Sequence, residues 1–196
     1  MARLLLAALM LRDPETALHG RRVARVALRI ELVLSERMRP LPFPLDRVSL
    51  RTGAVLHDIG KVGIDLEILQ KPDTLTEAER AAIRRHPRLG YEMCAPYEEL
   101  RAVLEIIRHH HERWDGAGYP DRLTGHAIPL PARVVSVADA FDALTSERPY
   151  RAAQSAARAR RIVEGEAGAQ LDPDVIEAFL AVPVLEWEAL RCLPDG

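Results

Sequence analysis

The sequence predicts an all-α protein, and three observations lead to this fold class. Apolar residues recur at helical spacing in several segments, and no run shows the alternation typical of a strand. Helix-start signals such as Asp13-Pro14 stand before these segments. With 196 residues, 48% of them apolar, the chain is long enough for one buried core and short for two full domains. We therefore expect a single-domain helical bundle over residues 1–196.

The expected helices follow one another along the chain. Val23, Ala27 and Ile30 share one face of residues 14 to about 36, which indicates a long amphipathic helix. Thr76 and Glu79 form a capping-box pattern that opens a short helix, which stops before His86-Pro87. The other expected helices are 48–56, 100–111 with His110 and His111 in its last turn, 132–145, 155–166 and the segment from Asp172 onward; 40–44 and 115–121 are expected connectors.

The first eleven residues are apolar apart from one arginine and superficially resemble a signal peptide. The run is far below the roughly 18 residues of a membrane span, and no clear small-x-small cleavage site follows before Arg12-Asp13-Pro14. We expect a first core helix here. Because the chain starts so close to its first motif, it could also be a domain of a longer protein.

Charge and cysteine content limit the classes of partner. A formal net charge of −2 gives no global reason to expect a nucleic-acid polymer or an anionic membrane as partner. Cys94 and Cys192 have no paired spacing, which fits a reducing cytoplasm and provides neither a disulfide framework nor a thiolate metal site. The oligomeric state, a homodimer included, is left open.

Two pairs in the first third of the chain are candidate metal ligands. Glu15 and His19 are four residues apart, so on a helix they project from one face and can meet at one ion, although a solvated face is the commoner outcome. His57 and Asp58 are adjacent at a helix end. Successive residues of a helix diverge by about 100°, so both side chains can contact one metal site only at its edge. A carboxylate that is bidentate or bridges two ions would satisfy this geometry. An exposed polar helix terminus is the alternative.

Further histidines strengthen the metal hypothesis. His110 and His111 continue an apolar helical face and should point inward. Buried imidazoles need partners, and this pair together with His57 and His86 would be hard to satisfy without a metal. His109 is expected to be more exposed and not to be a ligand.

Two carboxylates lie in an otherwise apolar helix. Asp139 is costly to bury there unless it is paired or bound to a cation, and Asp142 shares its face three residues later. Asp139 as a metal ligand and Asp142 as a carboxylate that binds a partner group would account for both residues. A salt-bridged core aspartate is the alternative.

Four stretches of the chain combine histidines, aspartates and basic residues: HDIGK at 57–61, HPRLG at 86–90, HHERWDGAGYP at 110–120 and VADAFDALTSERPYR at 137–151. They resemble the successive motifs of the HD-GYP phosphodiesterases, a family of the HD superfamily. The long motif around Gly118-Tyr119-Pro120 is hard to reach by chance, whereas an isolated His-Asp dipeptide means almost nothing. The resemblance runs from about Asp13 to Leu180, which leaves 181–196 as a C-terminal helical tail.

The resemblance implies two or three divalent metal ions, usually iron or manganese; nickel or zinc would suit the same ligand types. An acid at position 15 tends to accompany a three-metal site. The implied metal ligands are Glu15, His19, His57, Asp58, His86, His110, His111 and Asp139. The implied substrate contacts are Lys61, Arg148 and Arg151, cations that suit phosphate oxygens, and we add Asp142 as a fourth substrate-binding residue.

The implied activity is hydrolysis of cyclic di-GMP to pGpG, GMP or both. A hydroxide bridging two ions would attack phosphorus, with Asp58 orienting it and Lys61 stabilising the phosphoryl charge. The loop at 118–120 would close over the site or contact diguanylate cyclase domains, and His126, where the family often has an acid, is expected to be an exposed loop residue. The alternatives are an HD-type nucleotide phosphohydrolase of other specificity and a non-catalytic cyclic di-GMP sensor or docking module.

Overall fold

The computed structural model of the chain describes residues 1–37, 46–147 and 152–193, and these residues form helices and no strand. The all-α prediction is therefore confirmed; the expected connector at 40–44 lies outside the described residues. The α-helices are α1 (Ala2–Arg12), α2 (Pro14–Arg37), α3 (Arg47–Leu56), α4 (Leu66–Leu69), α5 (Glu77–Ile83), α6 (His86–Cys94), α7 (Leu104–His109), α8 (Leu130–Thr145), α9 (Ala156–Gly165), α10 (Pro173–Ala181) and α11 (Val184–Arg191). The 3-10 helices are η1 (Ile59–Gly63), η2 (Glu98–Val103) and η3 (Gly125–Ala127).

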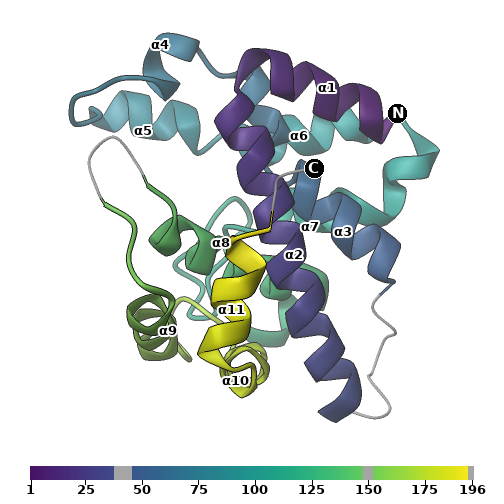
Figure 1. Cartoon of the computed structure of the whole chain (residues 1–196). Helices are drawn as coiled ribbons and strands as arrows, with labels where there is room; N and C mark the ends of the chain where they lie inside the picture. The colour runs from purple at the N-terminus through teal and green to yellow at the C-terminus, as the bar shows by residue number, and fades with distance from the viewer. Residues whose placement is uncertain (38–45, 148–151, 194–196) are drawn as a thin grey trace.

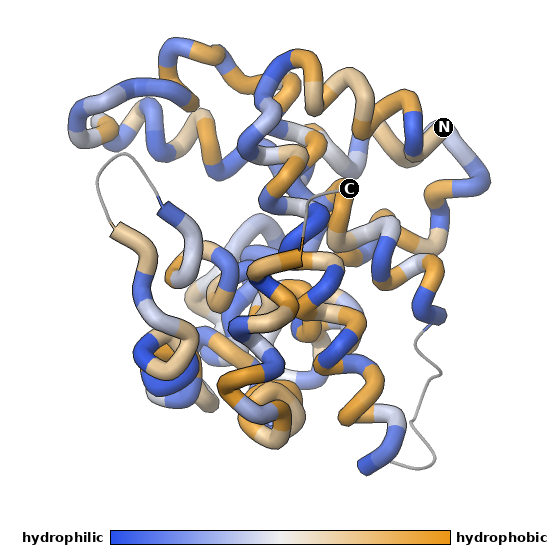
Figure 2. The backbone as a smooth tube through the Cα atoms, in the orientation of Figure 1, coloured by the Kyte–Doolittle hydropathy of each residue, from blue (hydrophilic) through white to orange (hydrophobic). Residues whose placement is uncertain are grey.

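Helix α2 is the central element of the bundle. It runs between α1, α4, α5 and α6 at one end of the molecule and α9, α10 and α11 at the other (Figure 1). It packs most extensively against α3 and α8. Hydrophobic and hydrophilic residues are interspersed along it (Figure 2), as expected for a helix that buries one side over its whole length.

Side-chain caps place several helix boundaries where the sequence predicts them. Asp13 accepts a backbone N–H in the first turn of α2, and the capping box of Thr76 and Glu79 is present at α5. Ser155 caps α9 and Asp172 caps α10 in the same way. These caps satisfy N–H groups that have no partner within the helix, so the helices begin at these residues.

The region around the adjacent histidines differs from the expectation. In place of one helix over 100–111, η2 is followed by the short α7, which ends at His109. His110 is the C-cap, and His111 lies in the turn after it, where the amide of Glu112 bonds to the carbonyl of His109. His109 is buried rather than exposed, and its Nε2 lies 3.0 Å from Asp121 Oδ2.

Buried apolar side chains form two clusters. One surrounds α2, α8, α9, α10 and α11, where the rings of Phe141, Phe179 and Trp187 contact one another. The other surrounds α1, η1, α6 and α7, and the buried Leu9 of α1 packs in this cluster. Helices α2, α3 and α7 contribute to both clusters, so they lie where the two clusters meet.

Over the described ranges, no helix combines the length and the apolar character that crossing a membrane requires. Helix α1, the apolar N-terminal segment, has 11 residues.

Candidate metal centre

Seven of the eight expected metal ligands converge in the interior. They form two groups, and within each group the candidate ligand atoms lie within 4.8 Å of one another. The first group is Asp58, His86, His110 and His111, and the second is His19, His57 and Asp139. Histidine and carboxylate sets of this size are typical of sites for divalent transition metals.

Most of these side chains lie at helix ends, where the backbone turns and neighbouring residues can face one space. His57 is the C-cap of α3, and Asp58 directly precedes η1. His86 opens α6, which packs against η1. Gly60 makes this packing possible, since a Cβ there would lie 1.9 Å from the carbonyl oxygen of His86.

Asp58 lies between the two groups and directs one oxygen toward each. Its Oδ1 is 3.1 Å from His86 Nε2 and 3.9 Å from His110 Nε2. Its Oδ2 is 3.4 Å from His57 Nε2 and 4.0 Å from His19 Nε2. This is the arrangement that a carboxylate bridging two ions requires.

Hydrogen bonds on the far side of the imidazoles set their tautomers. The Nδ1 atoms of His57, His86 and His110 each donate to the carbonyl oxygen three residues earlier, at 2.6, 2.7 and 2.9 Å. A carbonyl only accepts, so the proton of each neutral ring is on Nδ1 and the Nε2 lone pair faces the cluster. Histidines that bind metals are commonly oriented in this way.

Among the described residues, no proton donor meets these lone pairs. His86 Nε2 and His110 Nε2 are 3.2 Å apart, and neither carries a proton for the other. Within the same ranges, His57 Nε2 and Asp58 Oδ1 are buried without a hydrogen-bond partner. Buried polar atoms left in this state are costly. A cation would satisfy all of them, so the donor set fits divalent metal.

The electrostatics of the first group favour neutral imidazoles around a charged carboxylate. Burial and the neighbouring His86 lower the pKa of His111 to about 3, and burial with the other imidazoles holds the pKa of His110 well below its usual value. Burial raises the pKa of Asp58, but Lys61 and the imidazoles outweigh it and bring that pKa well below normal. Neutral imidazoles and an ionised carboxylate are the protonation states that bind a metal.

His19 in the second group is held by two carboxylates. Its Nε2 is 3.0 Å from Asp139 Oδ1, and its Nδ1 donates to Asp142 Oδ2 at 2.7 Å. Burial lowers the pKa of His19, but these two partners outweigh it and raise the pKa to about 9. Burial opposes ionisation of Asp139 as well, yet His19 keeps the pKa of that carboxyl far below its ordinary value.

Two expected site residues lie beside the cluster rather than in it. Asp142 is buried and accepts from His19 and from Arg22, whose Nε lies 3.0 Å from Oδ1. Its oxygens are thus used within the protein, although it lines the cavity described below. Glu15 belongs to neither ligand group; it is 70% exposed and accepts from Arg22 Nη2 at 2.9 Å. No motif in the sequence pointed to Arg22.

A cavity of about 610 Å³ opens onto the cluster and is bordered by residues of both groups. Lys61 lines it, with Nζ 2.6 Å from Asp58 Oδ2. Glu147 lines it as well and is the last described residue before the gap at 148–151. The two expected substrate contacts Arg148 and Arg151 fall in that gap and lie outside the described residues.

The loop after His111 folds back onto the site. The ring centroids of Tyr119 and His111 lie 5.0 Å apart, with an angle of 31° between the ring planes. The guanidinium of Arg84 lies over the Tyr119 ring, 5.6 Å from its centroid. Gly118 permits the close approach, because a Cβ there would be 2.3 Å from Arg113 N. Pro120 follows in a cis peptide bond.

Glu112 holds this loop, a role that the sequence did not reveal. It is buried and accepts the backbone N–H groups of Asp121 at 2.7 Å and Leu123 at 3.1 Å. Farther along the loop, His126 is exposed, as expected, with its ring 5.0 Å from that of Trp114.

The fold and the cluster together define a helical domain with a histidine and aspartate centre suited to divalent metal. The sequence matches the family described as HD domain over residues 10–175. The chain belongs to this family and, by its motifs and relatives, to the HD-GYP group within it.

Two curated proteins of Vibrio cholerae are among its relatives. One, called a cyclic di-GMP phosphodiesterase, is 41% identical over 180 residues, 87% of this chain and 37% of the relative. The other, called a 3'3'-cGAMP-specific phosphodiesterase, is 38% identical over 186 residues, 94% of this chain and 37% of the relative. The chain thus spans less than half the length of either protein.

A solved structure agrees with the fold. The HDG"Y"P protein Bd1817 of Bdellovibrio bacteriovorus superposes with a TM-score of 0.67 at 23% identity, over 89% of this chain and 53% of that one. At this level of identity the similarity concerns the fold alone.

Proposed function

We propose that this chain is the catalytic domain of a metal-dependent phosphodiesterase that hydrolyses cyclic di-GMP to pGpG, GMP or both. The observation that carries the proposal is Asp58, whose two oxygens face two separate groups of ligands. Paired metal sites of this kind serve the hydrolysis of phosphate esters. The cyclic di-GMP phosphodiesterase among the relatives supports the substrate.

Two ions are proposed, one held by each ligand group with Asp58 shared, and iron or manganese is the proposed metal, with nickel or zinc as alternatives. Bound ions would supply activated water and positive charge beside the phosphate. Glu15 would join a third position only after leaving Arg22, so two ions are favoured.

The protein's own groups have distinct tasks in this proposal. Asp58 orients the attacking water, and Lys61 at the cavity wall binds a phosphoryl oxygen as charge develops on it. Arg148 and Arg151 are proposed as further phosphate contacts, next in sequence to the cavity residue Glu147. The backbone-bound Nδ1 atoms of His57, His86 and His110 keep the lone pairs in place throughout.

A second candidate substrate is 3'3'-cGAMP. The similarity to a phosphodiesterase named as specific for that dinucleotide favours it. Both molecules are cyclic dinucleotides with two phosphodiesters, and a cavity of about 610 Å³ is within the range of small-molecule sites. The metal centre would act on either, so base recognition at the cavity wall would decide between them.

The loop at Gly118, Tyr119 and Pro120 is proposed to close over the site or to contact diguanylate cyclase domains, and a homodimer is proposed as the assembly. A cytoplasmic location is supported by the two free cysteines.

The test is a chromatographic assay of the iron- or manganese-loaded protein with cyclic di-GMP, 3'3'-cGAMP and nucleoside monophosphates. We expect pGpG or GMP from cyclic di-GMP, no turnover by Asp58→Ala, and full turnover by the exposed control Asp73→Ala. Cleavage of 3'3'-cGAMP alone would favour the second candidate, and cleavage of monophosphates a general phosphohydrolase. Loaded protein that binds the dinucleotide without cleaving it would refute the catalytic proposal.

A further inference from the structure

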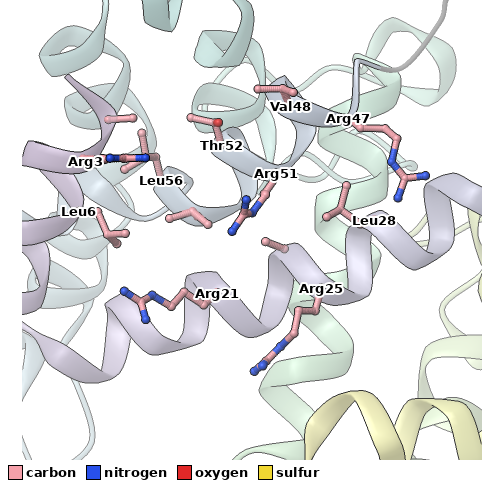
Figure 3. A pocket seen from close by; sticks show the side chains of 13 residues that line it. Arg3, Leu6, Arg21, Arg25, Leu28, Arg47, Val48, Arg51, Thr52 and Leu56 are labelled. Atoms are coloured by element: carbon pink, nitrogen blue, oxygen red, sulfur yellow. The ribbon is translucent and has the colours of Figure 1, made fainter. Parts of the chain in front are cut away.

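A second cavity lies away from the metal centre, between α1, α2 and α3 (Figure 3). Its volume is about 890 Å³, and it shares no lining residue with the cavity at the cluster. Its walls come from the first turns of α1, the middle of α2 and most of α3. Nothing in the proposed phosphodiesterase reaction uses these side chains.

The charge of the lining is of one sign. Among the described residues, its lining contains the five arginines Arg3, Arg21, Arg25, Arg47 and Arg51 and no aspartate or glutamate. Arg25 Nη1 donates to the carbonyl of Leu193 at 3.1 Å, and Arg47 Nη1 pairs with Glu31 Oε2 at 3.0 Å.

The other three cations come from three different helices. Arg3 on α1, Arg21 on α2 and Arg51 on α3 are drawn toward the space between these helices, whereas Arg25 points away from it (Figure 3). Within the described part of the chain, Arg3 and Arg51 make no hydrogen bond or ion pair through their side chains. Guanidinium groups are well suited to phosphate, because they offer paired donors that match its oxygens.

The floor between the arginines is apolar. Leu6, Ala24, Leu28, Val55 and Leu56 line it, and Thr52 adds one hydroxyl. A cavity with an apolar floor, a few polar groups and this volume is typical of small-molecule sites. The combination suits a ligand with a phosphate at one end and a flat, weakly polar body at the other, which is the chemistry of a nucleotide.

We infer that this cavity is a binding site for a nucleotide-sized organic phosphate, with Arg3 and Arg51 as its principal phosphate contacts. The site is separate from the metal centre but shares two helices with it, since α2 also carries His19 and α3 leads directly into His57. A ligand here would therefore contact the helices that position the second ligand group.

The test is fluorescence anisotropy of the full chain, stripped of metal with chelator, with N-methylanthraniloyl-GTP as probe. We expect saturable binding with a Kd below about 1 mM and a loss of about tenfold or more in Arg3→Ala/Arg51→Ala, because two charge-assisted phosphate contacts disappear. The matched control Arg88→Ala/Arg101→Ala removes two exposed arginines elsewhere and should bind normally. Asp58→Ala should also bind normally, and N-methylanthraniloyl-guanosine, which has no phosphate, should not bind.

Several results would overturn the inference. These are an absence of binding up to millimolar probe, binding that Arg3→Ala/Arg51→Ala leaves unchanged, and binding that Asp58→Ala abolishes. Equal binding of the nucleoside would remove the role of the phosphate. Circular dichroism melting of each variant separates loss of binding from loss of fold.

Discussion

The imidazole of His19 is held between two carboxylates, and its Nδ1 donates to Asp142 Oδ2 at 2.7 Å. Asp142 is buried and also accepts from Arg22, so its position is fixed from two sides. The aspartate thus acts on the metal centre through His19, as a positioning residue.

Asp142→Asn should weaken metal binding at the second ligand group. The neutral amide can accept only through one oxygen and more weakly than the carboxylate, and its NH₂ would face either His19 or Arg22, so the ring is held less firmly with Nε2 toward the cluster. Loss of such an outer contact typically costs about 10- to 100-fold in affinity. Metal titration against a chelator of known affinity measures the loss, and Asp73→Asn is the exposed control. Unchanged affinity would contradict the positioning role.

Metal loading should release protons in a way that distinguishes the two groups. Because the carboxylates raise the pKa of His19 to about 9, this ring is protonated near neutral pH and must lose a proton to bind metal. His111, with its pKa lowered to about 3, is already neutral and releases none. Affinity at the second group should therefore rise with pH, by roughly tenfold per unit for one displaced proton, until about pH 9.

Isothermal titration calorimetry in buffers of different ionisation enthalpy counts those protons. We expect His19 to release about one proton for every two ions that bind at neutral pH. Asp142→Asn removes one of the carboxylates that raise the pKa of His19, so it should lower the count. A count of zero in the unmodified protein would rule out a protonated His19.

Gly60→Ala should displace η1 from α6. Its Cβ would meet the carbonyl of His86 at 1.9 Å, and backbone cannot move aside as a flexible side chain can. We expect a loss of about 2 kcal/mol or more in the free energy of unfolding, because overpacking at a buried backbone contact is costly. Gly165→Ala is the matched control, since nothing lies within 4 Å of a Cβ there. Equal melting temperatures for the two variants would disprove the steric argument.

Glu112→Gln should loosen the loop that carries Tyr119. The glutamine amide can still accept one hydrogen bond, but its NH₂ would face a backbone N–H at Asp121 or Leu123. We expect faster hydrogen exchange at these two amides and a loss of about 2 kcal/mol in stability. Exposed Glu98→Gln should change neither. Exchange rates that stay unchanged would show that the loop is held by other contacts.

Much of this architecture follows from local signals in the sequence. The capping box at Thr76, the cap at Asp172 and the apolar face of α2 each predict an observed helix. These inferences succeed because they depend on residues close together in the sequence. The histidines and aspartates of the two ligand groups are spread over positions 19–139, and the resemblance to the HD-GYP family rather than local spacing predicted them as one set.

The features that sequence reasoning missed depend on distant contacts. The buried His109 pairs with Asp121, and the buried Glu112 accepts from two backbone amides of the following loop. The pairing of Asp142 with Arg22 spans 120 positions. Local periodicity carries no information about such partners, and so Asp142 was expected to face a ligand rather than His19.

The meeting point of the two hydrophobic clusters has a mechanical consequence. Helices α2, α3 and α7 contribute to both clusters, and the metal-ligand candidates His57 and His110 lie at the C-terminal ends of α3 and α7. Cations bound there would connect two parts of the molecule that otherwise have separate hydrophobic clusters. Removing the metal should then loosen the region where the two clusters meet before either cluster unfolds, so bound ions would contribute to the rigidity of the protein.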